Sequence, residues 1–131
     1  MRSYRRKRPP LDACPVELVL SMVQGKWTAR LIFLLLQRPC HFGELQRLIP
    51  GISVEVLATR LRTLQGVGLA TVQSRTGPNN VTLSIYALTE KGQSLAPVLQ
   101  GLADWGQREL RTQGLSWEPP LIDRDAVEPV P

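Results

Sequence analysis

A run of six consecutive apolar residues, at positions 31–36, sets the strongest constraint on how this chain folds. The run belongs to a longer segment, residues 27–37, whose apolar side chains would cover nearly every face of a helix. Such a helix has to be packed on all sides, as in the centre of a domain. Arg38 and Pro39 follow, and a proline disfavours the helical conformation of the residue before it. We therefore expect residues 27–37 to form the central helix of the core.

A first helix is expected over residues 15–23, because proline suits the first position of a helix. Apolar residues recur along this segment at the spacing of one helical face. They are Val16, Val19, Leu20 and Val23. Leu18 and Met22 lie off this stripe, so we expect them to form a second apolar surface that meets another helix or another subunit.

A short helix, a turn and a longer helix are predicted next, over residues 42–48, 50–52 and 54–65. Ser53 is a favourable N-cap for the longer helix. One face of this helix is apolar and is expected to point inward, with Val54, Leu57, Leu61 and Leu64. The opposite face, at about 100° per residue, is small and polar, with Glu55, Thr59, Arg62 and Thr63. The longer helix is therefore expected to present a polar face to its surroundings.

Two strands and a last helix complete the predicted order. Residues 69–75 and 81–88 are rich in strand-forming residues, and a turn cluster at 77–80 separates them, which is typical of a β-hairpin. Thr89 is expected to cap a helix that continues to about residue 111 and is kinked by Pro97. Its expected inward stripe consists of Leu95, Leu99, Leu102 and Trp105. Trp27, on the central helix, is also expected to lie in the core.

Charge and composition divide the chain into three parts. Residues 1–11 carry five basic and no acidic residues and are expected to be a flexible basic arm. Residues 12–111 are expected to form one folded domain, and residues 112–131, rich in proline and acidic residues, a disordered tail. The net charge of +5 favours a polyanionic partner, although such an arm can also serve only as a solubilising segment.

The predicted order of elements is that of a winged helix-turn-helix domain, a mainly α fold with a small β-hairpin wing. In this fold the helix after the turn enters the major groove of DNA. The same order can also serve protein contacts alone, so a winged-helix protein–protein interaction module without DNA binding is the alternative. Enzyme activity is not expected, since the chain has one histidine, no glycine-rich phosphate loop and no convergent pair of acids.

Eight short motifs stand in order along residues 12–110. They are Cys14-Pro15-Val16-Glu17, Gly25-Lys26-Trp27, Phe42-Gly43-Glu44-Leu45, Pro50-Gly51-Ile52-Ser53, Leu57 with Arg60-Leu61-Arg62, Gly68-Leu69, Tyr86-Ala87-Leu88-Thr89 with Gly92, and Leu102-Ala103-Asp104-Trp105-Gly106. Together they closely resemble the HxlR-type winged helix-turn-helix regulators of bacteria and archaea. The resemblance implies a homodimeric repressor or activator that dimerises through its N- and C-terminal helices. Its two recognition helices would meet successive major grooves of an inverted-repeat operator in double-stranded DNA.

The candidate DNA-binding residues lie on the recognition helix and beside it. The residues expected in the major groove are Ser53, Glu55, Thr59 and Arg62, those expected on phosphates are Lys26 and Arg60, and Arg75 is expected to contact phosphate from the wing. The alternative for Arg60 is an ion pair within the chain.

Two features depart from the family pattern, an acidic Glu55 where a basic residue is common and a neutral wing at residues 81–83. The basic arm is expected to compensate for both.

Cys14 is a candidate sensor of oxidants or electrophiles. It precedes the first helix, where the helix dipole and the nearby arginines favour the reactive thiolate. The resemblance implies such a role, because several HxlR-type regulators use a cysteine before Pro-Val to sense oxidants, quinones or aldehydes. The alternative is a capping cysteine without a redox role. Cys40 is expected to be inert.

No metal, cofactor or membrane contact is expected. Cys14, Cys40 and His41 do not have the spacing of metal ligands. The longest apolar run is far below the roughly 18 residues of a membrane span, and the basic start leads into prolines instead of an apolar leader. The chain is therefore expected to be cytoplasmic.

Overall fold

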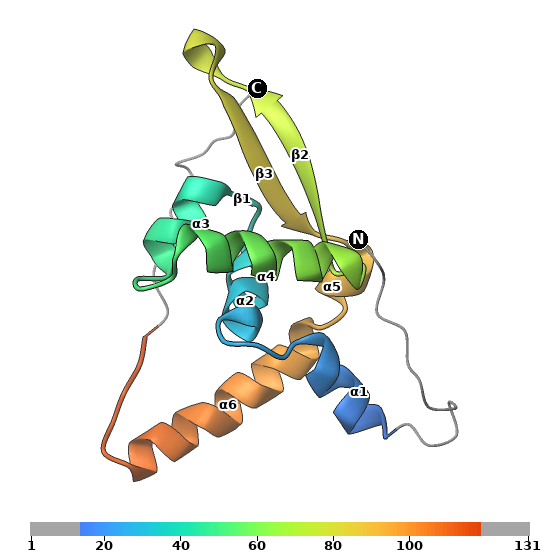
Figure 1. Cartoon of the computed structure of the whole chain (residues 1–131). Helices are drawn as coiled ribbons and strands as arrows, with labels where there is room; N and C mark the ends of the chain where they lie inside the picture. The colour runs from blue at the N-terminus through green and yellow to red at the C-terminus, as the bar shows by residue number, and fades with distance from the viewer. Residues whose placement is uncertain (1–13, 119–131) are drawn as a thin grey trace.

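A computed structural model of the chain describes residues 14–118 and has the expected elements in the expected order, apart from an added short strand and a last helix divided in two (Figure 1). The helices are α1 (Pro15–Met22), α2 (Thr28–Leu35), α3 (Phe42–Leu48), α4 (Val54–Gly66), α5 (Glu90–Gln93) and α6 (Ala96–Thr112), and the strands are β1 (Cys40–His41), β2 (Ala70–Thr76) and β3 (Thr82–Leu88). The fold is mainly helical with a small antiparallel sheet, which confirms the predicted fold class. The predicted basic arm and the tail beyond residue 118 lie outside the described residues.

Helix α2 occupies the centre of the core, as its apolar run predicts. Four of its leucine and isoleucine side chains are fully buried, at positions 31, 32, 34 and 35. Leu45 of α3 and the inner face of α4 pack into the same cluster. Full burial of each such side chain contributes about 1.5–3 kcal/mol. The core therefore fixes α3 and α4 against α2. Trp27 also packs against this cluster, as expected.

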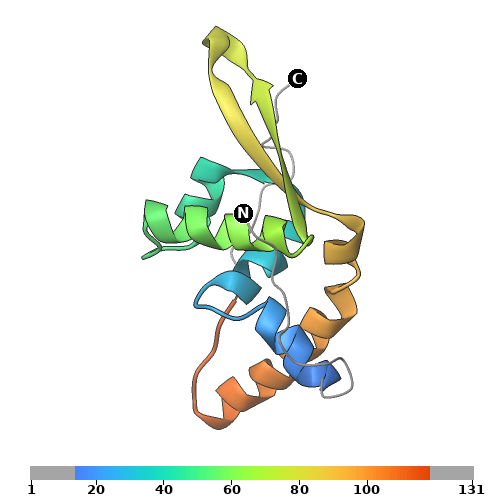
Figure 2. The ribbon, with the colours of Figure 1, turned by 45° about the vertical axis from the view of Figure 1, so that its right-hand side comes forward.

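The sheet has the strand order β1-β3-β2 and is antiparallel throughout. Ala70 pairs with Leu88 at the base of the hairpin, and Thr76 pairs with Thr82 near its tip. Figures 1 and 2 show the hairpin extending away from the helices. At the tip, Asn79 and Asn80 have left-handed backbones, with φ of 63° and 58°, a conformation that asparagine adopts more readily than most residues. Strand β1 was not predicted, since two residues cannot show an alternating pattern.

The prediction of one last helix kinked at Pro97 is wrong. The structure has two helices, α5 and α6, because the chain turns at Ser94 and Leu95. Pro97 is the second residue of α6, where a missing N–H removes no hydrogen bond of the helix. Pro97 therefore helps to begin α6 instead of bending a longer helix. Thr89 caps α5 as predicted, because its hydroxyl accepts a hydrogen bond from the Gly92 amide at 3.1 Å.

The predicted inward stripes of the first and last helices are partly wrong. Val16 and Leu20 of α1 are 66% and 54% exposed, and Leu102 and Trp105 of α6 are 55% and 62% exposed. Leu18 and Met22, expected to meet another helix or another subunit, are partly buried, and Met22 packs against the core of its own chain. These two helices lie at the outer side of the domain (Figure 1), so one of their faces meets no other element of the described chain. On α4, Val54 is also exposed, contrary to expectation.

Within residues 14–118, the structure has no helix that is both long and apolar enough to cross a membrane.

Candidate nucleic-acid interface

Helix α4 presents its polar face because its opposite face is anchored in the core. Leu57, Leu61 and Leu64 are buried at the helical spacing of three and four residues. The Ser53 hydroxyl caps the helix and accepts a hydrogen bond from the Val56 amide at 3.1 Å. The four residues predicted to enter the major groove are all exposed, namely Ser53, Glu55, Thr59 and Arg62. The local sequence therefore anchors one face of α4 in the core and leaves its polar face accessible.

Arg62 lies on the exposed face of α4, and its charge acts on Tyr86 of β3. Its guanidinium donates a hydrogen bond to the Thr59 hydroxyl at 3.3 Å, one turn earlier on the same face. Burial raises the pKa of Tyr86 on β3, and the positive charge of Arg62 partly opposes that rise. No carboxylate pairs with Arg62 among residues 14–118. The helix thus offers one uncompensated guanidinium beside a threonine methyl group.

Arg60 is held by the loop between α1 and α2. Its Nε donates a hydrogen bond to the Lys26 carbonyl oxygen at 2.8 Å. The predicted alternative, an ion pair with an acid, is not what the structure has, since the partner is a backbone carbonyl. The bond uses Nε and leaves the two terminal nitrogens of the guanidinium for other acceptors. Lys26 and Arg60 therefore form a paired positive site beside α4.

The loop that holds Arg60 has a constrained backbone. Gly25 has a φ of 99° and Trp27 a φ of 82°, and a left-handed backbone is uncommon for a tryptophan. The Lys26 ammonium lies 4.7 Å from the centre of the Trp27 ring. Sequence reasoning missed the bond between Arg60 and Lys26, because no local pattern signals a contact across 34 positions.

The start of α3 is fixed by a cluster of polar contacts. Glu44 accepts two hydrogen bonds from the Arg38 guanidinium and one from the His41 amide, and His41 Nδ1 accepts one from the Glu44 amide. Burial alone would raise the pKa of Glu44, but the bonds from Arg38 and His41 hold that pKa below its ordinary value. This capping box ties α3, the helix before the turn, to the end of α2.

The two cysteines have opposite surroundings. Cys14 is exposed at the N-cap of α1, whereas Cys40 is buried on β1. Burial first and the charge of Glu44 second raise the pKa of the Cys40 thiol, Arg38 partly opposes them, and the resulting pKa is about 11. A thiol with this pKa stays protonated near neutral pH and is a poor nucleophile. Cys40 is thus unreactive, as expected, and Cys14 is the accessible thiol of the described chain.

The hairpin carries a single charged side chain. Arg75 is exposed on β2, opposite Leu83 of β3. All other residues between positions 70 and 88 are uncharged, and the exposed ones are mainly threonine, serine, asparagine, glutamine and valine. The wing therefore offers hydrogen-bonding groups with little electrostatic attraction.

Known proteins resemble this chain in sequence and in fold. The model of the HxlR-like helix-turn-helix family matches residues 22–114. The HTH-type transcriptional regulator YkvN of Bacillus subtilis is 37% identical over 95 residues, which cover 72% of this chain and 78% of that protein. The solved structure of the redox regulator HypR in its reduced form is similar with a TM-score of 0.70 and 27% identity, and covers 77% of this chain and 98% of that one. Reduced YodB of B. subtilis, a transcriptional regulator, has a TM-score of 0.63 and 33% identity, over 73% of this chain and 93% of that one.

Proposed function

We propose that this chain, which belongs to the HxlR-like helix-turn-helix family, acts in the cytoplasm as a homodimer on an inverted-repeat operator. Members of this family are DNA-binding transcriptional regulators and not enzymes, and the same therefore holds for this chain. The observation that carries this proposal is the exposed polar face of α4 opposite three buried leucines. A rigid helix with such a face suits the width of the major groove. It favours DNA binding over a module that contacts only proteins.

On α4 we assign base contacts to the exposed face and phosphate contacts to its neighbours. Arg62 suits the two acceptors of a guanine edge, Thr59 a thymine methyl group, and Glu55 the amino group of cytosine. Lys26 and Arg60 would bind phosphate, and the hydrogen bond that Arg60 donates to the Lys26 carbonyl oxygen holds them beside each other. Arg75 would add one phosphate contact from the wing. Ser53 caps α4 and would face the same groove.

The homodimer is supported by exposed apolar side chains on two neighbouring helices. They are Val16 and Leu20 on α1 and Val98, Leu102 and Trp105 on α6. Large apolar residues grouped in this way are unusual on the surface of a monomer and mark interaction sites. A twofold pairing of these faces would present two α4 helices to successive turns of DNA.

Removing the Arg62 side chain tests the assignment of base contacts. We expect Arg62→Ala to weaken binding to a selected operator roughly 10- to 100-fold, because a bidentate guanine contact contributes about 1–3 kcal/mol. The operator is selected by sequencing the genomic fragments that the native protein retains, and affinity is measured by fluorescence anisotropy. Arg111→Ala, which removes the same charge from an exposed position on α6, should bind like the native protein. If the native protein retains no DNA even at low salt, it is a protein-interaction module instead.

A second role, regulation by oxidants, is supported by the exposure of Cys14 and by the likeness to the redox regulator HypR. We expect diamide to change the operator affinity of the native protein and to leave that of Cys14→Ser unchanged. Cys40→Ala serves as the control and should respond as the native protein does, since its thiol is buried. Equal responses of native protein and Cys14→Ser would rule out a sensor role for Cys14.

A further inference from the structure

Two adjoining cavities lie between α2 and α6, on the side away from the recognition helix. Their volumes are about 600 Å³ and about 500 Å³. They share three lining residues, Phe33 of α2, Ala103 of α6 and Trp117. We call the two cavities together the α2–α6 groove. Volumes of this size are typical of small-molecule sites.

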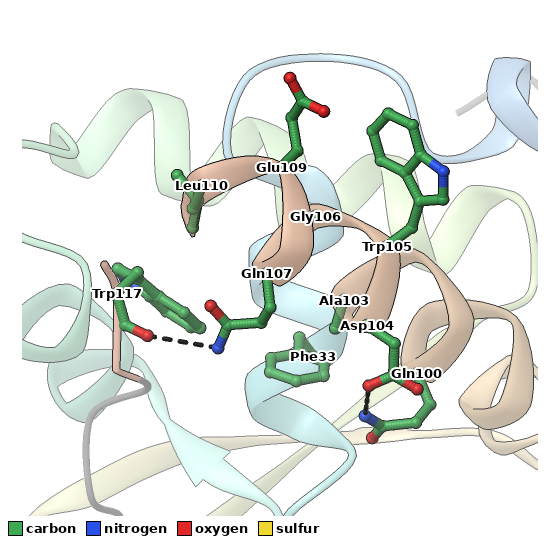
Figure 3. A pocket seen from close by; sticks show the side chains of 10 residues that line it. All are labelled: Phe33, Gln100, Ala103, Asp104, Trp105, Gly106, Gln107, Glu109, Leu110 and Trp117. Carbon is green, nitrogen blue, oxygen red and sulfur yellow. Dashed lines mark hydrogen bonds between the residues drawn. The ribbon is translucent and has the colours of Figure 1, made fainter. Parts of the chain in front are cut away.

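Trp117 reaches the groove because the chain turns back after α6. Gly114 has a φ of 75°, and the Leu115 amide donates a hydrogen bond to the Leu110 carbonyl oxygen at 2.8 Å. This is a helix end of the kind that reverses the chain. The Gln107 side chain then donates a hydrogen bond to the Trp117 carbonyl oxygen at 3.3 Å. Figure 3 shows Phe33 and Trp117 on either side of Gln107. The segment after α6 therefore supplies one aromatic wall of the groove.

Arg30 is the only charged side chain that lines the smaller cavity. Its guanidinium lies 5.7 Å from the centre of the Trp27 ring and 6.0 Å from that of Trp117. Among residues 14–118 it donates no hydrogen bond and pairs with no carboxylate. A half-buried guanidinium between two indole rings, with its N–H donors unused by the protein, is suited to an anionic partner.

We propose that the α2–α6 groove binds a small planar aromatic anion, such as an aromatic carboxylate or sulfonate. The ring would lie against Phe33 and Trp117, where aromatic side chains favour stacked or edge-to-face contacts. The anionic group would accept two hydrogen bonds from Arg30, which matches a planar oxyanion better than lysine does. The acidic residues that line the larger cavity, Asp104 and Glu109, repel an anion and direct it to the Arg30 end. This site goes beyond the proposed function, and its rim includes Leu102 and Trp105, which the proposed function places on the dimer face.

The test compares two dyes of similar shape and different charge on the full-length protein. Anilinonaphthalene sulfonate is an aromatic anion, and N-phenylnaphthylamine is its neutral counterpart. We expect saturable fluorescence with one sulfonate per protomer. Arg30→Gln should weaken the sulfonate roughly tenfold or more, the effect of losing charged hydrogen bonds, and should leave the neutral dye within about twofold. Trp117→Ala should weaken both dyes, whereas Arg108→Gln, which removes an exposed charge elsewhere on α6, should weaken neither.

Three outcomes overturn the proposal. The first is a native protein without saturable sulfonate binding, and the second is an Arg30→Gln protein that binds the sulfonate as tightly as the native one. The third is binding only by a variant that cannot dimerise, such as Leu20→Asp, because a second copy of the chain would then cover the groove. Thermal unfolding confirms that each variant is folded. Operator affinity, measured on the same samples, separates this proposal from the proposed function: a native protein that binds DNA but no dye contradicts only the groove.

Discussion

Gly92→Ala is expected to lower the free energy of unfolding by about 3 kcal/mol, near the upper end for added groups in a packed core. Gly92 is buried in α5, and a Cβ atom there would overlap the Leu69 carbonyl oxygen and lie 3.1 Å from the Leu88 Cβ. The Leu69 carbonyl also accepts a hydrogen bond from the Thr89 amide at 3.0 Å. Because the obstacle is backbone that is itself bonded, no change of side-chain rotamer relieves the overlap. The Tm should fall by roughly 10 °C or more.

The matched control is Gly101→Ala. Gly101 is also helical, but it is exposed on α6 and a Cβ atom there would meet nothing within 4 Å. This variant should keep or gain stability, by up to about 1 kcal/mol, since alanine favours a helix more than glycine does. Urea unfolding followed by circular dichroism measures both variants. A Gly92→Ala protein with the native urea midpoint would show that α5 does not pack so closely against Leu69 and Leu88 at the base of the hairpin.

Trp105→Glu is expected to abolish dimerisation and to weaken operator binding about 100-fold or more, because two linked half-sites gain 10²–10⁴ in avidity. Trp105 is a large exposed apolar side chain on α6. A carboxylate placed in an apolar interface would have to be desolvated without a partner. Sedimentation equilibrium should report a monomer, and anisotropy should show that any remaining binding resembles that of a single half-site.

Arg111→Glu is the control for this experiment. It introduces the same side chain on α6, at an exposed position on another face of the helix. It should remain dimeric and bind the operator. A dimeric Trp105→Glu protein with native affinity would mean that the apolar face of α6 does not form the dimer interface.

The parts of the fold that the sequence predicted well are those with local signals. The predicted limits of α3 coincide with its observed limits, and those of α4 differ by one residue. Both helices begin at capping residues, His41 and Ser53, whose side chains accept hydrogen bonds from the third residue of the helix. Caps, turns and apolar periodicity act over four or five residues, so they can be recognised without knowing the rest of the fold.

The errors concern features that depend on distant parts of the chain. An apolar stripe predicts that a helix buries a face, but it does not tell whether the same chain covers that face, since Leu20 and Trp105 lie on such stripes and are exposed. Pro97 signals a helix irregularity, but a kink and a new start leave the same local pattern. In the candidate site, the exposed face of α4 followed from helical periodicity. The bond that holds Arg60 and the fold-back of Trp117 did not, because both depend on tertiary packing.

The nearly uncharged hairpin affects how such a regulator would search a chromosome. Binding to random DNA is driven mainly by phosphate contacts that release counterions, and a wing with Arg75 as its only charge adds little to it. In the proposed dimer, the hydrogen-bonding groups of the wing would contribute only where the groove has the right shape and the two α4 helices are in register. The wing would therefore lengthen the residence time at the operator without lengthening it on random DNA. It would so raise the ratio of operator affinity to non-specific affinity, which decides how far the operator is occupied in a genome.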